Sequence, residues 1–157
     1  GKIAFSPMDI SLNELFTEIQ NFYKITSQKN EVKMEFKNQI DQNIYADKAI
    51  LRIVITNLIS NSFKYTKPGG IIFVSAIADT SSIIIEVKDT GTGMTEETLN
   101  SIFKDQQNIE STLGIHDEKG TGLGLAICHD LIKVHNGTIS ASSELDKGSS
   151  FIVKIPK

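Results

Sequence analysis

Residues 47–66 read DKAILRIVITNLISNSFKYT, and this stretch decides how the rest of the chain is interpreted. Asp47 is a suitable N-cap, and the apolar run behind it predicts a long helix that is buried over much of its surface. Asn57, Asn61 and Lys64 fall on one stripe of that helix. A buried amide without a hydrogen-bond partner costs about 1–3 kcal/mol, so the two asparagines are expected to have a task.

The stripe has the chemistry of a site for a metal-bound phosphate. An asparagine oxygen is a hard, neutral ligand of the kind that Mg²⁺ takes. Lys64 would add positive charge for phosphate, and the ring of Tyr65 would offer its face to a base. The alternative is that both asparagines bond to neighbouring loops and only hold the helix in place. This stretch by itself does not decide between the two.

A first glycine-rich loop, DTGTGM, occupies residues 89–94. Asp89 continues the buried face of a predicted strand, and a buried carboxylate must be paired or hydrogen-bonded. No lysine or arginine is placed beside it on that face of the strand, whereas the exocyclic amine of adenine would donate to it and the carbonyl of guanine would be repelled. Gly91 and Gly93 would let the backbone approach the purine. The alternative is a plain turn with a capped aspartate.

A second glycine-rich loop, GTGLGL, occupies residues 120–125 and leads into a helix expected from Gly122 to His135. Free backbone amides and the helix dipole make such a loop an anion site. The spacing fits neither a Walker loop nor a dinucleotide fingerprint, and a structural helix start is the alternative. The polar residues 104–119 are long for a connection, which indicates a lid over a triphosphate.

The remaining pattern predicts an α+β fold of two layers, a largely antiparallel sheet covered by helices. A capping box at residues 11–14 opens a helix that should run to about Lys29, with Phe22 and Tyr23 on its apolar face. Thr95 would cap a short helix that ends near residue 103. Strands are expected at residues 3–9, 32–36, 71–78, 82–89, 138–143 and 149–155.

Length and composition fit one domain. The chain has 157 residues, 39% of them apolar, and a net charge of -3, which argues against a general affinity for nucleic acid or anionic lipid. A single cysteine, Cys128, favours a reducing compartment. No apolar run approaches the roughly 20 residues that cross a bilayer.

In this order and spacing the motifs resemble the catalytic, ATP-binding domain of bacterial sensor histidine kinases, of the Bergerat or GHKL superfamily. Residues 57–66 resemble the N box, 89–94 the G1 box, 102–103 the F box, 120–125 the G2 box, and 147–151 the signature of the last strand. The resemblance implies a Bergerat fold over residues 1–157: a mixed, mostly antiparallel five-stranded sheet, three main helices on one face, and an ATP lid.

The resemblance also implies a role for each matched residue. Asn61 would ligate Mg²⁺, Lys64 would contact phosphate, and Asp89 would bind the adenine amine. Asn57 stands where hydrolysing relatives carry a glutamate that activates water, and an amide cannot be a general base, so a kinase is favoured. Asn57, Asn61 and Lys64 form the expected catalytic group. The residues expected to contact the nucleotide are Asn57, Asn61, Lys64, Tyr65, Asp89, Gly91, Gly93, Met94, Phe103, Lys119, Gly120, Thr121, Gly122, Leu123, Gly124, Leu125 and Ser150.

The implied activity is transfer of the ATP γ-phosphate to a histidine on a separate dimerisation domain of the same parent protein, with a response regulator receiver domain downstream. None of His116, His129 and His135 sits in an acceptor motif, so the phosphoacceptor helices are expected outside this chain. A cytoplasmic place within a membrane-anchored parent is expected, with no direct membrane contact by this domain. The alternatives are a non-catalytic nucleotide sensor, since the F box lacks the second Phe that usually comes shortly after the first, and a serine kinase of the anti-sigma-factor type.

Overall fold

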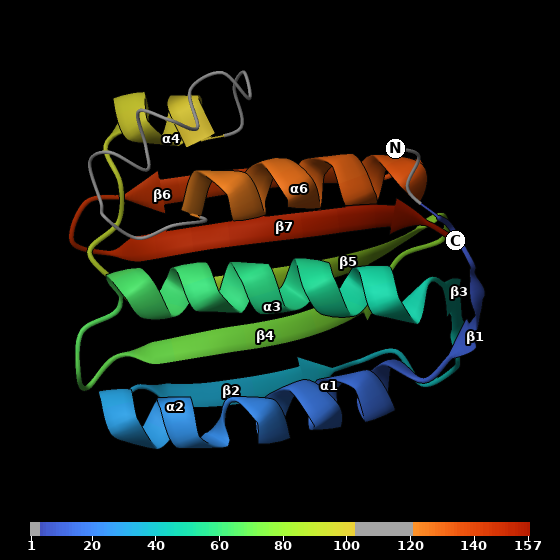
Figure 1. Cartoon of the computed structure of the whole chain (residues 1–157), viewed down its shortest axis with the longest axis horizontal. Helices are drawn as coiled ribbons and strands as arrows, with labels where there is room; N and C mark the ends of the chain where they lie inside the picture. The colour runs from blue at the N-terminus through green and yellow to red at the C-terminus, as the bar shows by residue number, and fades with distance from the viewer. Residues whose placement is uncertain (1–3, 103–120) are drawn as a thin grey trace.

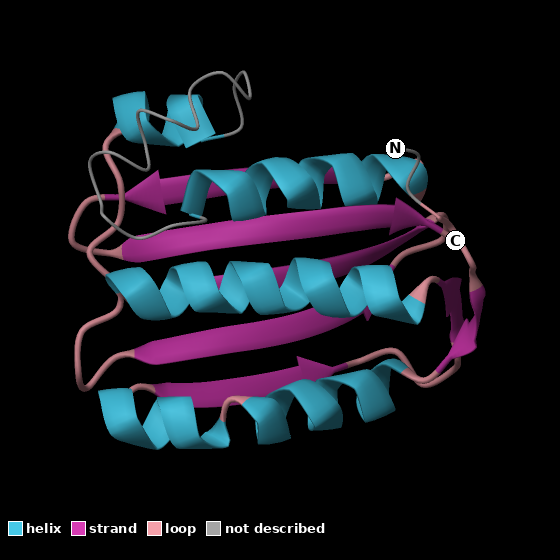
Figure 2. Cartoon of the chain, in the orientation of Figure 1, coloured by secondary structure: helices cyan, strands magenta, loops and turns pink. Residues whose placement is uncertain are grey.

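A computed structural model describes residues 4–102 and 121–157, apart from the side chains of residues 121–123. A five-stranded sheet forms one layer and helices form the other (Figure 1, Figure 2). The elements are β1 (Met8–Ile10), α1 (Leu12–Phe22), α2 (Lys24–Asn30), β2 (Lys33–Asn38), β3 (Ile44–Ala46), α3 (Lys48–Tyr65), β4 (Ile71–Ala78), β5 (Ser82–Asp89), α4 (Glu96–Ile102), α6 (Thr121–Val134), β6 (Thr138–Glu144) and β7 (Gly148–Pro156). The predicted fold class is confirmed.

The sheet has the strand order β2-β4-β5-β7-β6, with β2 and β4 parallel and every other pair antiparallel. Side chains alternate between its two faces. The face under the helices is apolar and at most 3% exposed on the three central strands, with Ile72, Val74, Ala76, Ile83, Ile85, Val87, Phe151, Val153 and Ile155. Figure 1 shows α1, α3 and α6 side by side across that face.

Helix α3 is the central element of the helical layer, and its predicted burial is confirmed. Asp47 caps it, because the Asp47 side chain accepts a hydrogen bond from the Ile50 N–H at 3.1 Å. The fully buried apolar side chains of α3 are Leu51, Val54, Ile55, Leu58 and Ile59. The helix therefore cannot shift along the sheet without disturbing the core.

The first helical region differs from its prediction as a single helix. It breaks at Tyr23, where α1 ends and α2 begins. The Tyr23 hydroxyl donates to the Thr56 carbonyl at 2.9 Å, which turns this ring inward onto α3. Phe22 was expected on the apolar face but is 73% exposed, whereas Tyr23 is 5% exposed and fills the place against α3.

Helix α6 runs antiparallel to α3. The start of α6 lies beside the second half of α3, where Gly124 faces Asn57. The end of α6 lies beside the start of α3, where the Asp47 N–H donates to His135 Nε2 at 3.1 Å. Asn136, with a φ of 58°, ends the helix in the left-handed region. In the described ranges no helix has the length and apolar character to cross a membrane.

Candidate nucleotide-binding site

Asp89 is the last residue of β5 and is buried, with 2% of its surface exposed. Its Oδ1 accepts hydrogen bonds from the Gly91 N–H at 2.9 Å and the Ser149 N–H at 3.3 Å. Burial raises the pKa of this carboxyl, and those two amides together with nearby Ser62 only partly offset the effect. No cation in the described part of the chain contributes to that pKa. Among the described residues, the site thus holds a buried acceptor without a counter-charge.

Two neighbouring side chains of α3 are also incompletely satisfied. Asn61 is 8% exposed, and its Oδ1 has no hydrogen-bond partner within the described residues. The Ser62 hydroxyl is fully buried and, though close enough to affect the Asp89 pKa, makes no well-formed hydrogen bond there. Nearly all buried polar atoms in folded proteins are bonded, so such atoms point to a ligand. A neutral amide oxygen that lacks a donor fits Mg²⁺.

Asn57 lies one turn before Asn61, at the contact between α3 and α6. Its Oδ1 is 3.3 Å from the position that a Cβ on Gly124 would occupy, so the glycine makes room for the amide. The buried Cys128 thiol lies near Asn57 and donates to the Val54 carbonyl at 3.8 Å, and burial raises the pKa of this thiol to about 12. The structure therefore brings together two predicted site residues from separate motifs, Asn57 and Gly124.

The end of α3 carries Lys64 and Tyr65, both half-buried. The Lys64 Nζ lies 5.9 Å from the centroid of the Tyr65 ring. The Tyr65 carbonyl accepts a hydrogen bond from the Thr92 N–H at 2.9 Å. The helix end is thereby tied to the loop that follows Asp89, so the predicted N-box and G1-box residues share one end of the fold.

Gly91 and Gly93 are needed for packing within the protein, and their predicted approach to a purine stays a prediction. A Cβ on Gly91 would overlap the Tyr65 carbonyl, and one on Gly93, which has a φ of +72°, would overlap the Glu144 carbonyl. Both glycines therefore let the loop pack against protein backbone. Met94, which follows them, is 8% exposed and donates its N–H to Ser143 Oγ at 2.7 Å.

Ser150 lies on the opposite face of the sheet from this cluster, and its expected contact with the nucleotide stays a prediction. It pairs with Lys88, and its hydroxyl donates to the Glu86 carboxylate on the face away from the helices. Ser149 takes the position opposite Asp89 instead. The period of two along β7 carries the missing signal, because Ser149 shares the face of the buried Phe151 and Ser150 does not.

Several predicted residues lie outside the described part of the chain. These are Phe103, Lys119, Gly120 and the proposed lid at 104–119. Thr121, Gly122 and Leu123 belong to the first turn of α6, but their side chains are not described. Leu125, in contrast, is 2% exposed and belongs to the hydrophobic core.

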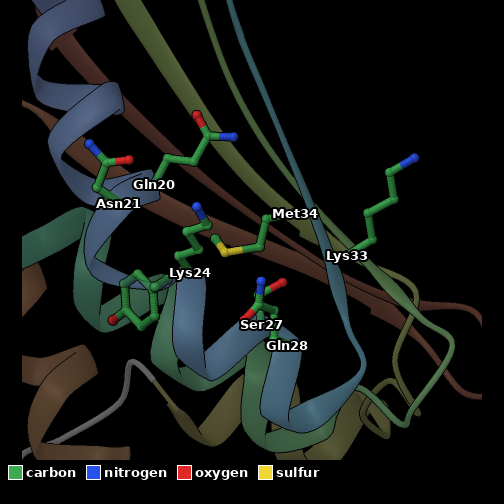
Figure 3. Close-up of a pocket in the computed structure, with 8 residues that line it drawn as sticks. Gln20, Asn21, Lys24, Ser27, Gln28, Lys33 and Met34 are labelled. Carbon is green, nitrogen blue, oxygen red and sulfur yellow. The ribbon is translucent and has the colours of Figure 1, made fainter.

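A separate hollow of about 360 Å³ lies between the α1–α2 break and β2. Its lining consists mainly of amide, hydroxyl and lysine side chains, and Figure 3 shows Lys33 extending away from the others. None of the predicted site residues borders it, and neither of the two unsatisfied atoms, Asn61 Oδ1 and Ser62 Oγ, belongs to its lining. It is therefore not the candidate site.

Comparisons with known proteins identify a family of nucleotide-binding domains. The family described as histidine kinase-, DNA gyrase B- and HSP90-like ATPase matches residues 46–157. Sensor protein SrrB of Staphylococcus aureus is 43% identical over 104 residues, which make up 66% of this chain and 18% of SrrB. This chain thus spans less than a fifth of that relative.

Solved structures show the same fold. The catalytic domain of histidine kinase ThkA has a TM-score of 0.79 and 27% identity, with 99% of each chain covered. Full-length ShkA in complex with AMPPNP has a TM-score of 0.83 and 23% identity, covering 99% of this chain and 32% of that one. The family match includes every site residue described above, from Asn57 to Ser149.

Proposed function

Because this chain belongs to the family of histidine kinase-, DNA gyrase B- and HSP90-like ATPases, we propose that it binds ATP with Mg²⁺ and transfers the γ-phosphate to a histidine on a separate dimerisation domain. One observation carries the proposal. The Asp89 carboxylate has no counter-charge and the Asn61 Oδ1 has no donor, although both are buried in the described structure. A ligand with an amine at one end and a cation at the other satisfies both groups.

Asp89 selects the base in this proposal. Both of its backbone hydrogen bonds go to Oδ1, which leaves Oδ2 to accept from the exocyclic amine of adenine. The Gly91 and Ser149 amides fix the orientation of the carboxylate before the base arrives. Guanine would place a carbonyl oxygen against this carboxylate, and the repulsion supplies specificity.

Asn61 and Lys64 act at the phosphate end. Asn61 Oδ1 is the protein oxygen that would ligate Mg²⁺, which supplies neutralisation of phosphate charge when it is bound. Lys64 adds a positive charge on the same stripe of α3. The backbone amides at the start of α6 form the anion site expected at a helix N-terminus. Catalysis of this kind depends on positioning and electrostatics, since the nucleophile belongs to the acceptor.

Asn57 limits the reaction with water. An amide has no usable basicity near neutral pH, and Asn57 lies against Gly124 at the start of α6. The domain therefore keeps ATP intact until an acceptor imidazole is presented. SrrB is named a sensor protein, and ThkA has been solved with a response regulator protein; we propose a response regulator partner and a cytoplasmic location for this chain by homology.

The test is phosphotransfer between separate polypeptides. The purified domain is mixed with the histidine-bearing dimerisation segment of its parent and with ATP labelled at the γ-phosphate. We expect label on the segment that is lost in acid and kept in alkali, as a phosphohistidine behaves. Label that resists acid would indicate a serine kinase, and ADP binding without any transfer would indicate a non-catalytic sensor.

A further inference from the structure

We propose that Ser143, which contacts no nucleotide in the proposed site, is a positioning residue that sets the choice of base by fixing the hydroxyl of Ser149 as a hydrogen-bond acceptor beside Asp89. The inference rests on the proposed ATP-binding function and extends it to a third strand of the sheet. It assigns a role in specificity to a residue outside all of the sequence motifs.

The three residues form a row across the end of the sheet. Asp89 on β5 pairs with Ser149 on β7, and Ser149 pairs with Ser143 on β6. Paired residues of neighbouring antiparallel strands point to the same face, with Cβ atoms about 4.5–5.5 Å apart. The row lies on the face that the helices cover, and exposure rises along it from buried Asp89 and Ser149 to half-buried Ser143.

The Ser143 hydroxyl uses its proton and both of its lone pairs in hydrogen bonds. Its Oγ accepts from the Met94 N–H at 2.7 Å and donates to the Gly148 carbonyl at 3.1 Å. It also lies 2.8 Å from Ser149 Oγ, with either hydroxyl able to donate in that contact. A hydroxyl has one proton and two lone pairs. Because Ser143 donates its proton to Gly148, Ser149 must be the donor to Ser143.

This arrangement determines what Ser149 presents to a ligand. Its proton is committed to Ser143, so its free lone pairs make it an acceptor only. The row of Ser149 and the Asp89 carboxylate then forms an edge of acceptors that suits the amine of adenine. Without Ser143, the Ser149 hydroxyl could rotate and donate to the carbonyl of guanine. Ser143 therefore strengthens the discrimination that Asp89 begins.

The experiment compares the affinities for MgADP and MgGDP by calorimetry. Ser143→Ala should lower the preference for ADP over GDP by about tenfold, as expected for one hydrogen bond gained by the wrong base. Ser143→Thr keeps the hydroxyl and should keep the preference. Ser142→Ala is the matched control, since Ser142 is the adjacent, exposed residue of β6 and pairs with Ser150 on the other face. Its preference should equal that of the wild type.

An unchanged preference in a folded Ser143→Ala variant would overturn the inference, as would an equal loss in Ser142→Ala. Should Ser143→Ala fail to fold, Ser143→Cys replaces it with the same expectation, because a thiol is a weak hydrogen-bonding group. A wild-type domain that binds neither nucleotide would overturn the proposed function itself. A wild-type preference for ADP that survives in Ser143→Ala would overturn the inference alone.

Discussion

The charged form of Asp89 that the proposed function needs is the form that burial makes unfavourable for stability. Burial raises the pKa of its carboxyl above the ordinary value of 3.8. The folded protein therefore holds the proton more tightly than the unfolded chain does. The resulting stabilisation is fully present below the ordinary pKa and is lost as the pH rises through the raised value. At neutral pH the fold thus carries an unfavourable buried charge that the adenine amine would relieve.

Asp89→Asn removes that charge but keeps an oxygen for the Gly91 and Ser149 amides. We expect the variant to exceed the wild type in unfolding free energy at about pH 7, with the difference shrinking towards about pH 4. Its affinity for ADP should fall roughly 10- to 100-fold, because the new amide group presents donors to the adenine amine. Urea unfolding at both pH values and calorimetry with MgADP measure the two effects. A variant that loses stability and keeps its affinity would contradict this account of Asp89.

The Asn61 Oδ1, which has no hydrogen-bond partner among the described residues, allows a test of the proposed Mg²⁺ site. Asn61→Ala should leave the stability of the nucleotide-free domain nearly unchanged, since no hydrogen bond to the described residues is lost. The gain in ADP affinity on adding Mg²⁺ to an EDTA-treated sample should disappear. Ser60→Ala is the control on the same helix, because Ser60 Oγ contacts the Tyr23 hydroxyl at 2.7 Å instead. A Mg²⁺ effect that persists in Asn61→Ala would assign the metal to other ligands.

A comparison of Gly148 with Gly69 distinguishes the cost of backbone strain from the cost of close packing. It has a φ of +115°, and a Cβ there would overlap the Asp89 carbonyl, whereas Gly69, with a φ of +92°, has open space around it. Gly69→Ala should cost about 1 kcal/mol of unfolding free energy through φ alone. Gly148→Ala should cost more and should also weaken ADP binding, because the β6–β7 turn must move away from Asp89. Equal costs measured by denaturant unfolding would show that the contact is unimportant.

At the scale of elements, α3 is positioned from both ends. Asp47 caps its start and also accepts from the Ser6 N–H at 2.8 Å through its second carboxylate oxygen. At the other end, the Tyr65 carbonyl is bonded to the loop after β5. These two anchors fix the position of α3 along its axis, and with it the positions of Asn57 and Asn61 relative to Asp89. Asp47 therefore helps to position the site as well as capping the helix.

Asp47→Ala should lower the unfolding free energy by about 1–2 kcal/mol, because the cap of α3 and the partner of Ser6 are lost together. Asp47→Asn retains a capping oxygen and should recover most of that loss. Thermal unfolding of the two variants beside the wild type makes the comparison. Equal melting temperatures for Asp47→Ala and the wild type would contradict the role of the cap.

The sequence predicted most strongly those elements whose signals are local. The Asp47 cap, the period-two hairpin of β4 and β5, and the Thr95 cap, whose Oγ1 accepts from the Thr98 N–H at 3.1 Å, are confirmed. The break at Tyr23 was missed because the residue's hydrogen bond to Thr56, distant in sequence, leaves no local signal. Strand β3 was missed because three residues show too little alternation, and pairing with β1 defines it.

In the candidate site, too, the residues with local sequence signals were predicted and those defined by contacts between distant segments were missed. The motifs identified Asp89, Asn57 and Asn61, which the structure places on β5 and α3 as expected. Ser149 and Ser143 were missed. The period of two along β7 could have identified Ser149, whereas Ser143 gains its importance from pairing with Ser149 across strands, which no local pattern reveals. Gly91 and Gly93 approach the backbone of Tyr65 and Glu144, a packing role that the sequence did not indicate, and their approach to a purine stays a prediction.

At the scale of the whole molecule, the two layers bring distant segments to one end of the fold. Helix α3 supplies the predicted metal ligand, and β5 supplies the carboxylate that we propose selects the base. The β6–β7 turn holds the loop that follows β5, with the Asp146 N–H donating to the Thr92 carbonyl at 2.8 Å. The open face of the sheet carries Glu86, Lys88 and Ser150 and takes no part in this arrangement. The site therefore depends on the relative placement of helices and sheet.

A crystal structure of the domain with a non-hydrolysable ATP analogue and Mg²⁺ tests the central claim most directly. We predict the adenine amine within about 3 Å of an Asp89 carboxylate oxygen and Mg²⁺ about 2.1 Å from Asn61 Oδ1. A base bound away from Asp89, or a metal ion that does not contact Asn61, would contradict the account.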